Sequence, residues 1–232
     1  MKVAFITWKF PCLPNTFILN EVAEVIKLGH DVSIFSIVKS DEKITNPDLE
    51  QYRLPEKTFY FEDFITPASM RTQRNYNKID KITSNRYLNI FELYKHDDLS
   101  TEYYAISQIA KKIGKEKFDI IHACFGANSA TVAMVVSRVT GIPFTFESHA
   151  LDLYVSFRYA DEKKMYCSKI ITISNYNKKY LCYKYGLPDN KVVVKRVQFN
   201  KYFYHLLENQ RKKENQIVSV CRLAEIKGIR FG

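Results

Sequence analysis

The sequence predicts an α/β fold built on an open, doubly wound parallel sheet. Two observations carry this prediction. Short apolar runs rich in Val, Ile and Phe, typical of buried parallel strands, recur along the chain. Amphipathic stretches that end at glycine, as helices commonly do, separate several of these runs. This alternation predicts successive β-α-β units and therefore one sheet with helices packed on it.

The N-terminal part of the chain forms the clearest unit. Val3–Thr7 is a short apolar run that predicts the first strand. A proline-bearing loop follows, and Asn15 or Thr16 can cap the helix after it. Gly29 suits the left-handed residue that ends such a helix. Asp31–Val38 then predicts a second strand, which completes a β-α-β opening.

The alternation continues through most of the remaining chain. Further strands are expected at Lys57–Phe61, Phe118–Cys124, Pro143–Glu147, Lys169–Ile173 and Val192–Val194. Further helices are expected at about Leu99–Ile113, closed by Gly114, and at Ala127–Thr140, Val155–Tyr166 and Ser174–Tyr185. Residues 39–97 are the least regular. There, Ile90–Tyr94 fits part of a helix, whereas Arg71–Arg86 has no usable period and is interpreted as a loop or insertion.

The length of the chain, 232 residues, predicts one full domain and the beginning of another. Residues 1–200 are expected to form the first domain and 201–216 a polar linker. Residues 217–232 would then start a second domain, with Ile217–Val220 as its first strand. Because so little chain follows that strand, we expect the second domain to be incomplete.

The charge of the chain is unevenly distributed. The net charge is +10, yet residues 1–120 contain 17 basic and 17 acidic residues, whereas residues 121–232 contain 18 and 8. A one-sided excess of this kind favours an anionic partner, such as phosphates, an acidic membrane surface or nucleic acid. A solvated lysine-rich surface is the alternative interpretation. Since no nucleic-acid-binding motif accompanies the basic residues, we expect no nucleic-acid partner.

The cysteine pattern and the N-terminus indicate the compartment. The five cysteines are scattered and form no CxxC pair, so neither a structural zinc site nor a disulfide framework is indicated. Free cysteines in apolar surroundings fit a reducing compartment. The apolar run at the N-terminus is too short for a signal peptide or a membrane span. We therefore expect a cytoplasmic protein, with peripheral attachment to the inner face of the membrane left open.

In parallel sheets ligands bind beyond the carboxyl ends of the strands, which directs attention to the loops that follow each predicted strand. The first loop lacks a glycine fingerprint, which argues against a classical dinucleotide site. Asn15 and Thr16 at its end serve either as helix caps or as part of an acceptor-facing surface. In the next loop His122 is either a core histidine or a site residue. Gly126 allows either a tight turn or close approach of a ligand.

Two later loops carry denser polar groups. Glu147–Asp152 places Glu, Ser, His and Asp within six residues of a strand end. There His149 could orient or polarise a hydroxyl, and Asp152 could hold a histidine or a ligand hydroxyl. A helix-capping loop is the alternative. After the last apolar run, Arg222 and Lys227 form a basic pair that suits a diphosphate.

Four stretches together carry a family resemblance. They are FPCLPNTFILNEVAEVIKLGHDVSIFSI (10–37), HACFGANSATVAMVVSRVTGIPFTFESHALDLY (122–154), ITISNYNKKYLCYKYGLPDNKVVVKR (171–196) and SVCRLAEIKG (219–228). In combination they resemble the family 4 retaining glycosyltransferases of the GT-B fold, notably the branch that builds bacterial and archaeal surface polysaccharides. The resemblance covers nearly the whole chain except about 39–97.

The resemblance implies a Rossmann-like N-terminal domain that faces the acceptor and a C-terminal domain that binds a sugar-nucleotide donor. His149 matches the family histidine beside the transferred sugar, which makes it the candidate catalytic residue. Arg222 and Lys227 match the basic pair that holds the donor diphosphate. Two cations would stabilise the leaving group electrostatically, so neither a metal nor another cofactor is expected. The acceptor-side loops would contribute the residues Asn15, Thr16, Gly126 and Asp152.

The sequence also departs from the family pattern. Cys221 stands where a glycine usually precedes the arginine, and Gln198 replaces another glycine. The segment expected to carry the acidic E-x7-E motif does not follow Gly232. The resemblance therefore implies a truncated or split glycosyltransferase, inactive alone, whose partners are a sugar nucleotide, a glycan or lipid-linked acceptor, and a separate donor-domain chain. The alternative is a non-enzymatic module, derived from such an enzyme, that binds a glycan, a membrane or a partner protein.

Overall fold

The computed structural model describes residues 1–65, 103–155, 157–197, 214–221, 223 and 225–231. The chain divides into two compact units, Met1–Phe199 and Asn200–Gly232. Every strand among the described residues belongs to the first unit.

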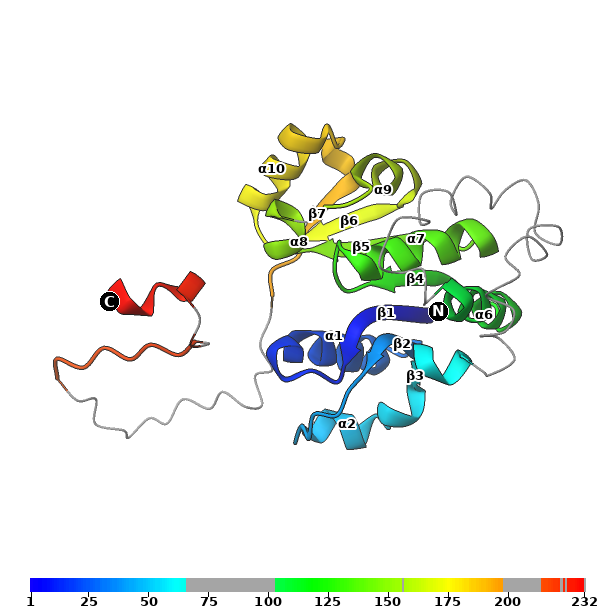
Figure 1. Ribbon diagram of the computed structural model, residues 1–232, viewed down its shortest axis with the longest axis horizontal. Coiled ribbons are helices and arrows are strands. Elements are labelled where there is room, and N and C mark those ends of the chain that lie inside the picture. Colours follow the sequence, from blue (N-terminus) through cyan, green and yellow to red (C-terminus); the bar gives the residue numbers. More distant parts are fainter. Residues whose placement is uncertain (66–102, 156, 198–213, 222, 224, 232) are drawn as a thin grey trace. The chain divides into compact units, whose positions relative to one another are not determined.

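The first unit is built on one parallel sheet (Figure 1). Its strands are β1 (Lys2–Phe10), β2 (Asp31–Lys39), β3 (Thr58–Tyr60), β4 (Ile120–Ala123), β5 (Phe144–Ser148), β6 (Lys169–Thr172) and β7 (Val192–Val194). They lie in the order β3-β2-β1-β4-β5-β6-β7, and every neighbouring pair is parallel. The order runs outward from β1 in both directions, as in a Rossmann-like, doubly wound sheet. The predicted fold class is therefore confirmed.

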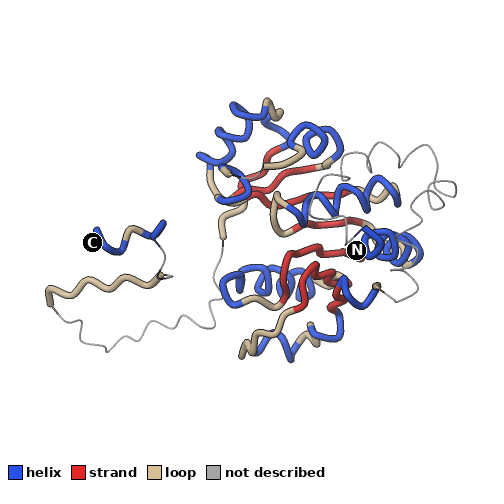
Figure 2. Tube along the Cα trace, in the orientation of Figure 1, coloured by secondary structure: helices blue, strands red, loops and turns tan. Residues whose placement is uncertain are grey.

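Helices separate most of the strands along the chain (Figure 2). They are α1 (Thr16–Lys27), α2 (Pro47–Gln51), α6 (Tyr103–Lys115), α7 (Asn128–Thr140), α8 (Leu151–Tyr154), α9 (Ala160–Tyr166) and α10 (Asn175–Tyr185). Short 3-10 turns complete the first unit at Leu13–Asn15, Pro55–Lys57, Phe61–Phe64 and Asp189–Lys191. Among the described residues no helix is long and apolar enough to cross a membrane.

The alternation of side chains along β1 generates two cores, one on each face of the sheet. Ala4 and Ile6 belong to a cluster that includes buried residues of α6 and α7. Val3 and Phe5 belong to a second cluster that includes buried residues of α1. Because both faces of β1 are covered, the strand is apolar at nearly every position, which is the pattern that predicted it.

The loop and helix after β1 lie at the carboxyl edge of the sheet, where the candidate site is described below. Within α1, Ile18 and Val22 are buried one turn apart and fix the helix against the sheet. Asn15 is the residue before the helix, yet its side chain makes no capping hydrogen bond. After α1, Gly29 adopts the left-handed conformation with φ of 84°, as predicted for the residue that ends this helix.

Two helix predictions need correction. Gly114 does not close the helix before β4, because α6 continues to Lys115; the first residues of the predicted span, 99–102, lie outside the described residues. The helix predicted at Val155–Tyr166 is interrupted: α8 precedes it and α9 begins only at Ala160. Tyr159, just before α9, has a left-handed φ of 55°, which a continuous right-handed helix does not allow.

The strand predicted at Ile217–Val220 is also wrong. In the second unit these residues form no regular element, and Ile217 and Val220 are almost fully exposed. A strand is defined by the neighbour that accepts its hydrogen bonds, and the described residues of this unit offer none. They contain two 3-10 turns, Glu225–Lys227 and Ile229–Phe231. The strand predicted at Lys57–Phe61 is confirmed by β3, whereas the predictions for Arg71–Arg86 and Ile90–Tyr94 lie outside the described residues.

Candidate functional site

Buried polar atoms gather at the carboxyl ends of the central strands. Thr7 of β1, His122 of β4 and Ser148 of β5 are all more than nine-tenths buried. The Thr7 and Ser148 hydroxyls and the His122 Nε2 atom have no hydrogen-bond partner among the described residues. Because buried polar atoms in proteins are nearly always paired, such a concentration marks this edge of the sheet as the candidate site.

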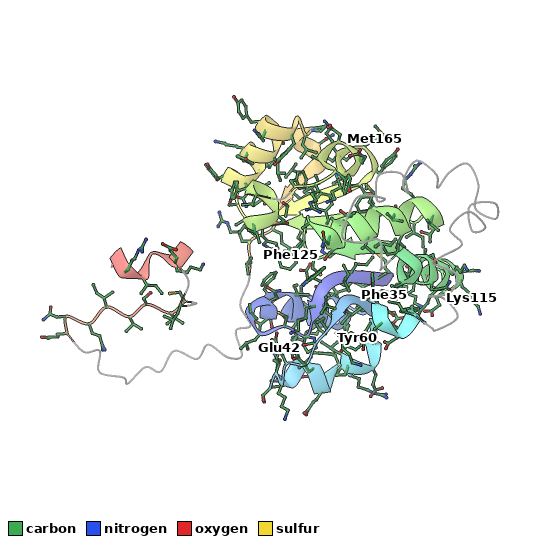
Figure 3. All side chains as sticks on the ribbon, viewed as in Figure 1. Phe35, Glu42, Tyr60, Lys115, Phe125 and Met165 are labelled. Atoms are coloured by element: carbon green, nitrogen blue, oxygen red, sulfur yellow. The ribbon has the colours of Figure 1, made fainter. Side chains whose placement is uncertain are left out.

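His149 lies at this edge, directly after β5. Its backbone N–H donates to Asp152 Oδ1 over 2.9 Å, which fixes the chain where it leaves the strand. Its ring centroid is 5.1 Å from that of Phe17 in α1 and 5.2 Å from that of Phe125 after β4. Phe17 and Phe125 also contact each other edge to face. Figure 3 labels Phe125 beside the blue α1. The histidine is therefore held by two aromatic rings from different elements, with 14% of its side chain exposed.

Asp152 joins two loops of the site. Its Oδ2 atom accepts a hydrogen bond from the Gly126 N–H over 2.6 Å, while Oδ1 accepts from the His149 N–H. The residue is 4% exposed, and both of its carboxylate oxygens are engaged by backbone donors. Asp152 therefore positions the loops, and its carboxylate does not contact the His149 ring.

A buried lysine secures the same loop from the other side. Lys163 of α9 is fully buried, and its ammonium donates to the carbonyl oxygens of Gly126 over 2.6 Å and Ala127 over 3.1 Å. The N–H of Gly126 is held by Asp152 and its C=O by Lys163, so this glycine peptide is fixed at both ends. An added Cβ at Gly126 would lie 2.9 Å from Asp152 Oδ2. The site therefore requires glycine here for close packing.

A charged cluster lies beside His149. The ammonium of Lys195, which follows β7, forms ion pairs with Glu21 of α1, over 2.6 Å, and with Glu147 of β5. Glu147 Oε2 lies 3.2 Å from His149 Nε2. His122 Nε2 is 3.8 Å from Glu21 Oε1, and its Nδ1 is 2.8 Å from the Thr145 hydroxyl. Residues of α1, β4 and β5 and the residue after β7 thus contribute to one electrostatic network, in which the Lys195 side chain is 41% exposed.

The network changes the protonation behaviour of its members. Burial alone would raise the pKa of Glu147, but the His149 hydrogen bond and the Lys195 charge outweigh burial and lower it to about 2. Burial opposes the charged form of Lys195, yet Glu21 and Glu147 raise its pKa above the ordinary value. Burial also lowers the pKa of His122. At neutral pH Glu147 is therefore ionised, Lys195 is charged and His122 is neutral.

Glu21, His122 and Glu147 meet the geometric requirement for a metal site, because one ligand atom from each lies within 4.8 Å of the other two. The ammonium of Lys195 is ion-paired with both carboxylates of this group. The cation that the two carboxylates require is thus supplied by the chain itself. A metal ion would have to displace Lys195 from both carboxylates, so these residues do not fit a resident metal.

The structure brings together most of the residues predicted from the sequence. His149, Asp152 and Gly126 are directly connected, and Asn15 and Thr16 lie at the start of α1, next to Phe17. Of the predicted diphosphate pair, Arg222 lies outside the described residues. Lys227 is exposed at the end of a 3-10 turn in the second unit.

Sequence reasoning included Glu147 in the polar loop but gave it no role, and it missed the other residues that support His149. Glu147 carried a usable signal, since it is a carboxylate at the end of a buried apolar strand, two positions before His149. Lys195 directly follows the apolar run of β7, at the same edge. Phe17 and Lys163 lie on helices, where an aromatic or basic residue carries no comparable signal.

The family model of Glycosyltransferase Family 4 matches residues 15–195, more than three quarters of the chain. The chain belongs to Glycosyltransferase Family 4. Among curated relatives, the amylovoran biosynthesis glycosyltransferase AmsK of Erwinia amylovora is 25% identical over 240 residues, covering 99% of this chain and 58% of its own length. The putative colanic acid biosynthesis glycosyltransferase WcaL of Salmonella typhimurium is 40% identical over 63 residues, 27% of this chain and 16% of the relative. This family 4 chain therefore spans less than two thirds of AmsK.

Solved structures share the fold of the family 4 chain. The Anabaena protein Alr3699/HepE, solved with UDP-glucose, matches with a TM-score of 0.55 and 13% identity, over 88% of this chain and 46% of that one. The UDP-GlcNAc 2-epimerase of Methanocaldococcus jannaschii matches with a TM-score of 0.51 and 14% identity, over 84% and 45%. At these identities the likeness shows the fold alone, and each structure is about twice the length of the matched part.

Proposed function

We propose that the chain is the acceptor-side part of a retaining glycosyltransferase that transfers a sugar from a sugar nucleotide to a lipid-linked or polysaccharide acceptor. The main support for this proposal is the position of His149 at the carboxyl edge of the sheet, where Phe17 and Phe125 hold its ring. Its Nδ1 atom has no hydrogen-bond partner among the described residues. A sugar offers both the apolar ring face that suits aromatic walls and the hydroxyls that a histidine nitrogen can bind.

The roles of the remaining residues follow from their chemistry. His149 contacts the transferred sugar and orients it for the reaction. Arg222 and Lys227 neutralise the charge that develops on the nucleotide diphosphate as the bond to the sugar breaks, so the transfer needs neither a metal nor another cofactor. Asn15, Thr16, Gly126 and Asp152 belong to the loops on the acceptor side. We also propose that the protein is cytoplasmic and works at the inner face of the membrane.

This chain matches 58% of the length of AmsK and about half the length of the two solved structures. We propose that transfer requires a donor-binding domain in addition to the residues described here, and that these residues are inactive without it. The sugar nucleotide is supported as a ligand by Anabaena Alr3699/HepE, which was solved with UDP-glucose.

The test is a transfer assay with purified protein. The chain, alone and co-expressed with a donor-domain chain, is incubated with radiolabelled UDP-sugars and lipid-linked acceptors. We expect label in the acceptor only when both chains are present. His149→Ala should abolish transfer without lowering the melting temperature. His30→Ala is the matched control, because His30 precedes β2 at the opposite edge of the sheet. Transfer by His149→Ala at the wild-type rate would contradict the proposal.

A second candidate function is a non-enzymatic module that binds an anionic membrane. Leu151 and Val155 lie one turn apart around α8, next to His149, and are 72% and 75% exposed. With the basic excess of residues 121–232, they form the combination of apolar and cationic groups that anionic bilayers bind. Flotation with vesicles that contain or lack anionic lipid tests this function. We expect binding only to anionic vesicles, weakened by salt; equal recovery with both vesicle types would contradict it.

A further inference from the structure

We propose that Glu147 is a positioning residue for His149: it accepts a hydrogen bond from Nε2–H and thereby presents Nδ1 as an acceptor to a sugar hydroxyl. This inference rests on the proposed function, in which His149 contacts the transferred sugar. In this carboxylate–imidazole pair, Glu147 fixes the orientation and the tautomer of His149.

The contact between the two side chains follows from the strand. Glu147 is the last residue but one of β5, and His149 follows the strand directly, two positions after Glu147. Glu147 Oε2 is 3.2 Å from His149 Nε2, within hydrogen-bond distance. The carboxylate is 3% exposed, and water therefore has little access to it. A buried carboxylate that faces an imidazole nitrogen orders the ring.

The carboxylate is an acceptor and not a donor, because Lys195 holds it in its ionised form. The Lys195 ammonium is paired with Glu147 and also with Glu21, so its charge stays at the carboxyl edge of the sheet. The low pKa of Glu147 agrees with this geometry. An ionised carboxylate offers no proton, so the hydrogen between the two residues must be carried by His149 Nε2.

The tautomer determines what the other nitrogen can do. A neutral imidazole with hydrogen on Nε2 has a lone pair on Nδ1. Among the described residues Nδ1 has no hydrogen-bond partner, and Phe17 and Phe125 restrict rotation of the ring. Nδ1 is therefore an acceptor with a fixed direction. Its natural partner is an alcohol O–H, which every sugar ring supplies.

A purely structural role for Glu147 would be to neutralise Lys195, whose side chain is 41% exposed. Glu21 provides the matched control for this alternative, because it pairs with the same ammonium but makes no hydrogen bond with His149. In Glu147→Gln the ammonium keeps Glu21 as its partner, so the substitution does not leave Lys195 unpaired. In Glu21→Gln the ammonium keeps Glu147. The two variants thus perturb the ion pairs similarly and differ in their effect on the histidine.

The first arm of the test observes the hydrogen bond directly and needs no activity. The chain is labelled with ¹⁵N-histidine, and the His149 signals among its five histidines are assigned with His149→Ala. At a pH where free histidine is neutral, we expect a downfield Nε2–H proton protected from exchange with water. This proton should disappear in Glu147→Gln and persist in Glu21→Gln. Absence of the proton in the wild type, or its persistence in Glu147→Gln, would overturn the inference.

The second arm measures transfer in the reconstituted enzyme. At metal-ligating histidines, loss of the carboxylate that orients the ring costs about 10- to 100-fold in affinity or activity, and we take this as the scale for His149. We expect kcat of Glu147→Gln to fall by about that factor with KM nearly unchanged, and Glu147→Asp to recover part of kcat. An unchanged kcat in Glu147→Gln would overturn the inference. If the wild type transfers no sugar, the proposed function fails, while the first arm still decides whether Glu147 fixes His149.

Discussion

The carboxylate of Asp152 reaches from the loop after β5 to the backbone N–H of Gly126 after β4, over 2.6 Å. The same carboxylate accepts the N–H of His149. One buried side chain thus sets the spacing between two neighbouring strand ends, and the candidate catalytic histidine is fixed by the same contact that fixes the glycine loop. The first two predictions follow from this arrangement.

Replacing Asp152 with alanine should destabilise the protein and disorder the site. The substitution leaves the N–H groups of Gly126 and His149 without their acceptor, and a buried donor without a partner costs about 1–3 kcal/mol. We expect the free energy of unfolding in urea to fall by about 3 kcal/mol, together with loss of transfer in the reconstituted enzyme. Asp161→Ala is the control, since its side chain is 87% exposed and its pair with Lys164 lies at the surface. Equal stability of the two variants would contradict this role of Asp152.

Gly126→Ala should be harmful although alanine is small. The new Cβ would lie 2.9 Å from Asp152 Oδ2 and 3.3 Å from the Ser148 hydroxyl, so the Asp152 carboxylate must shift away from the backbone donors it serves. We expect a loss of about 1–3 kcal/mol in thermal or urea unfolding. Gly114→Ala is the matched control. Gly114 lies in α6, where alanine favours the helix, and the added Cβ would lie 3.6 Å from the Thr140 side chain. This control should leave stability unchanged or slightly raised, and a larger loss at position 114 than at 126 would refute the packing argument.

Acid should weaken the fold through Glu147. Its pKa in the folded chain, about 2, lies below the ordinary value of 4.5. A depressed folded pKa adds stability above the unfolded pKa, and that stability is lost as the pH falls from about 4.5 toward 2. The loss should be on the order of 2–3 kcal/mol. Urea titrations between these pH values should give a steeper slope for the wild type than for Glu147→Gln, and parallel curves would contradict the prediction.

Thiol reagents should distinguish the five cysteines. Burial raises the pKa of Cys124 well above its ordinary value and that of Cys167 to about 11, so both remain thiols at neutral pH and are shielded as well. Cys221 is exposed, whereas Cys12 and Cys182 are half-buried. We expect a thiol-specific reagent to modify Cys221 first and to reach Cys124 and Cys167 only after denaturation. Mass mapping of the native protein provides the measurement, and early labelling of Cys124 would contradict it.

The sequence was sufficient for the features that depend on local pattern. Local pattern predicts three features within a few residues each: the apolar strand β1, the amphipathic helix α1 and the turn at Gly29. The parallel direction of the strands follows from their alternation with helices. Gly114 misled the prediction of where α6 ends, because a glycine one residue before the end of a helix has the same local signature as one just after it. The strand predicted at Ile217–Val220 is absent for a different reason: its apolar residues require neighbours that the described residues of the second unit do not provide.

The support around His149 could be predicted only in part. The loop from Glu147 to Asp152 was singled out because its polar residues exceed what a turn needs. The partners of these residues come from distant positions, however. Lys195 reaches Glu21 only because α1 and the end of β7 meet at one edge of the sheet, and Phe17 meets His149 for the same reason. Such pairings depend on the order of the strands, which no single stretch of sequence encodes.

Lys195 also determines where the chain leaves the first unit. Its backbone N–H donates to the Thr172 carbonyl, and its side chain is held by Glu21 and Glu147. The boundary between the units follows shortly after, at Phe199. The end of β7 is therefore tied by side-chain ion pairs to α1 and to β5, two elements far from it in the sequence. Fraying of this edge strand would have to break those ion pairs as well as its backbone hydrogen bonds.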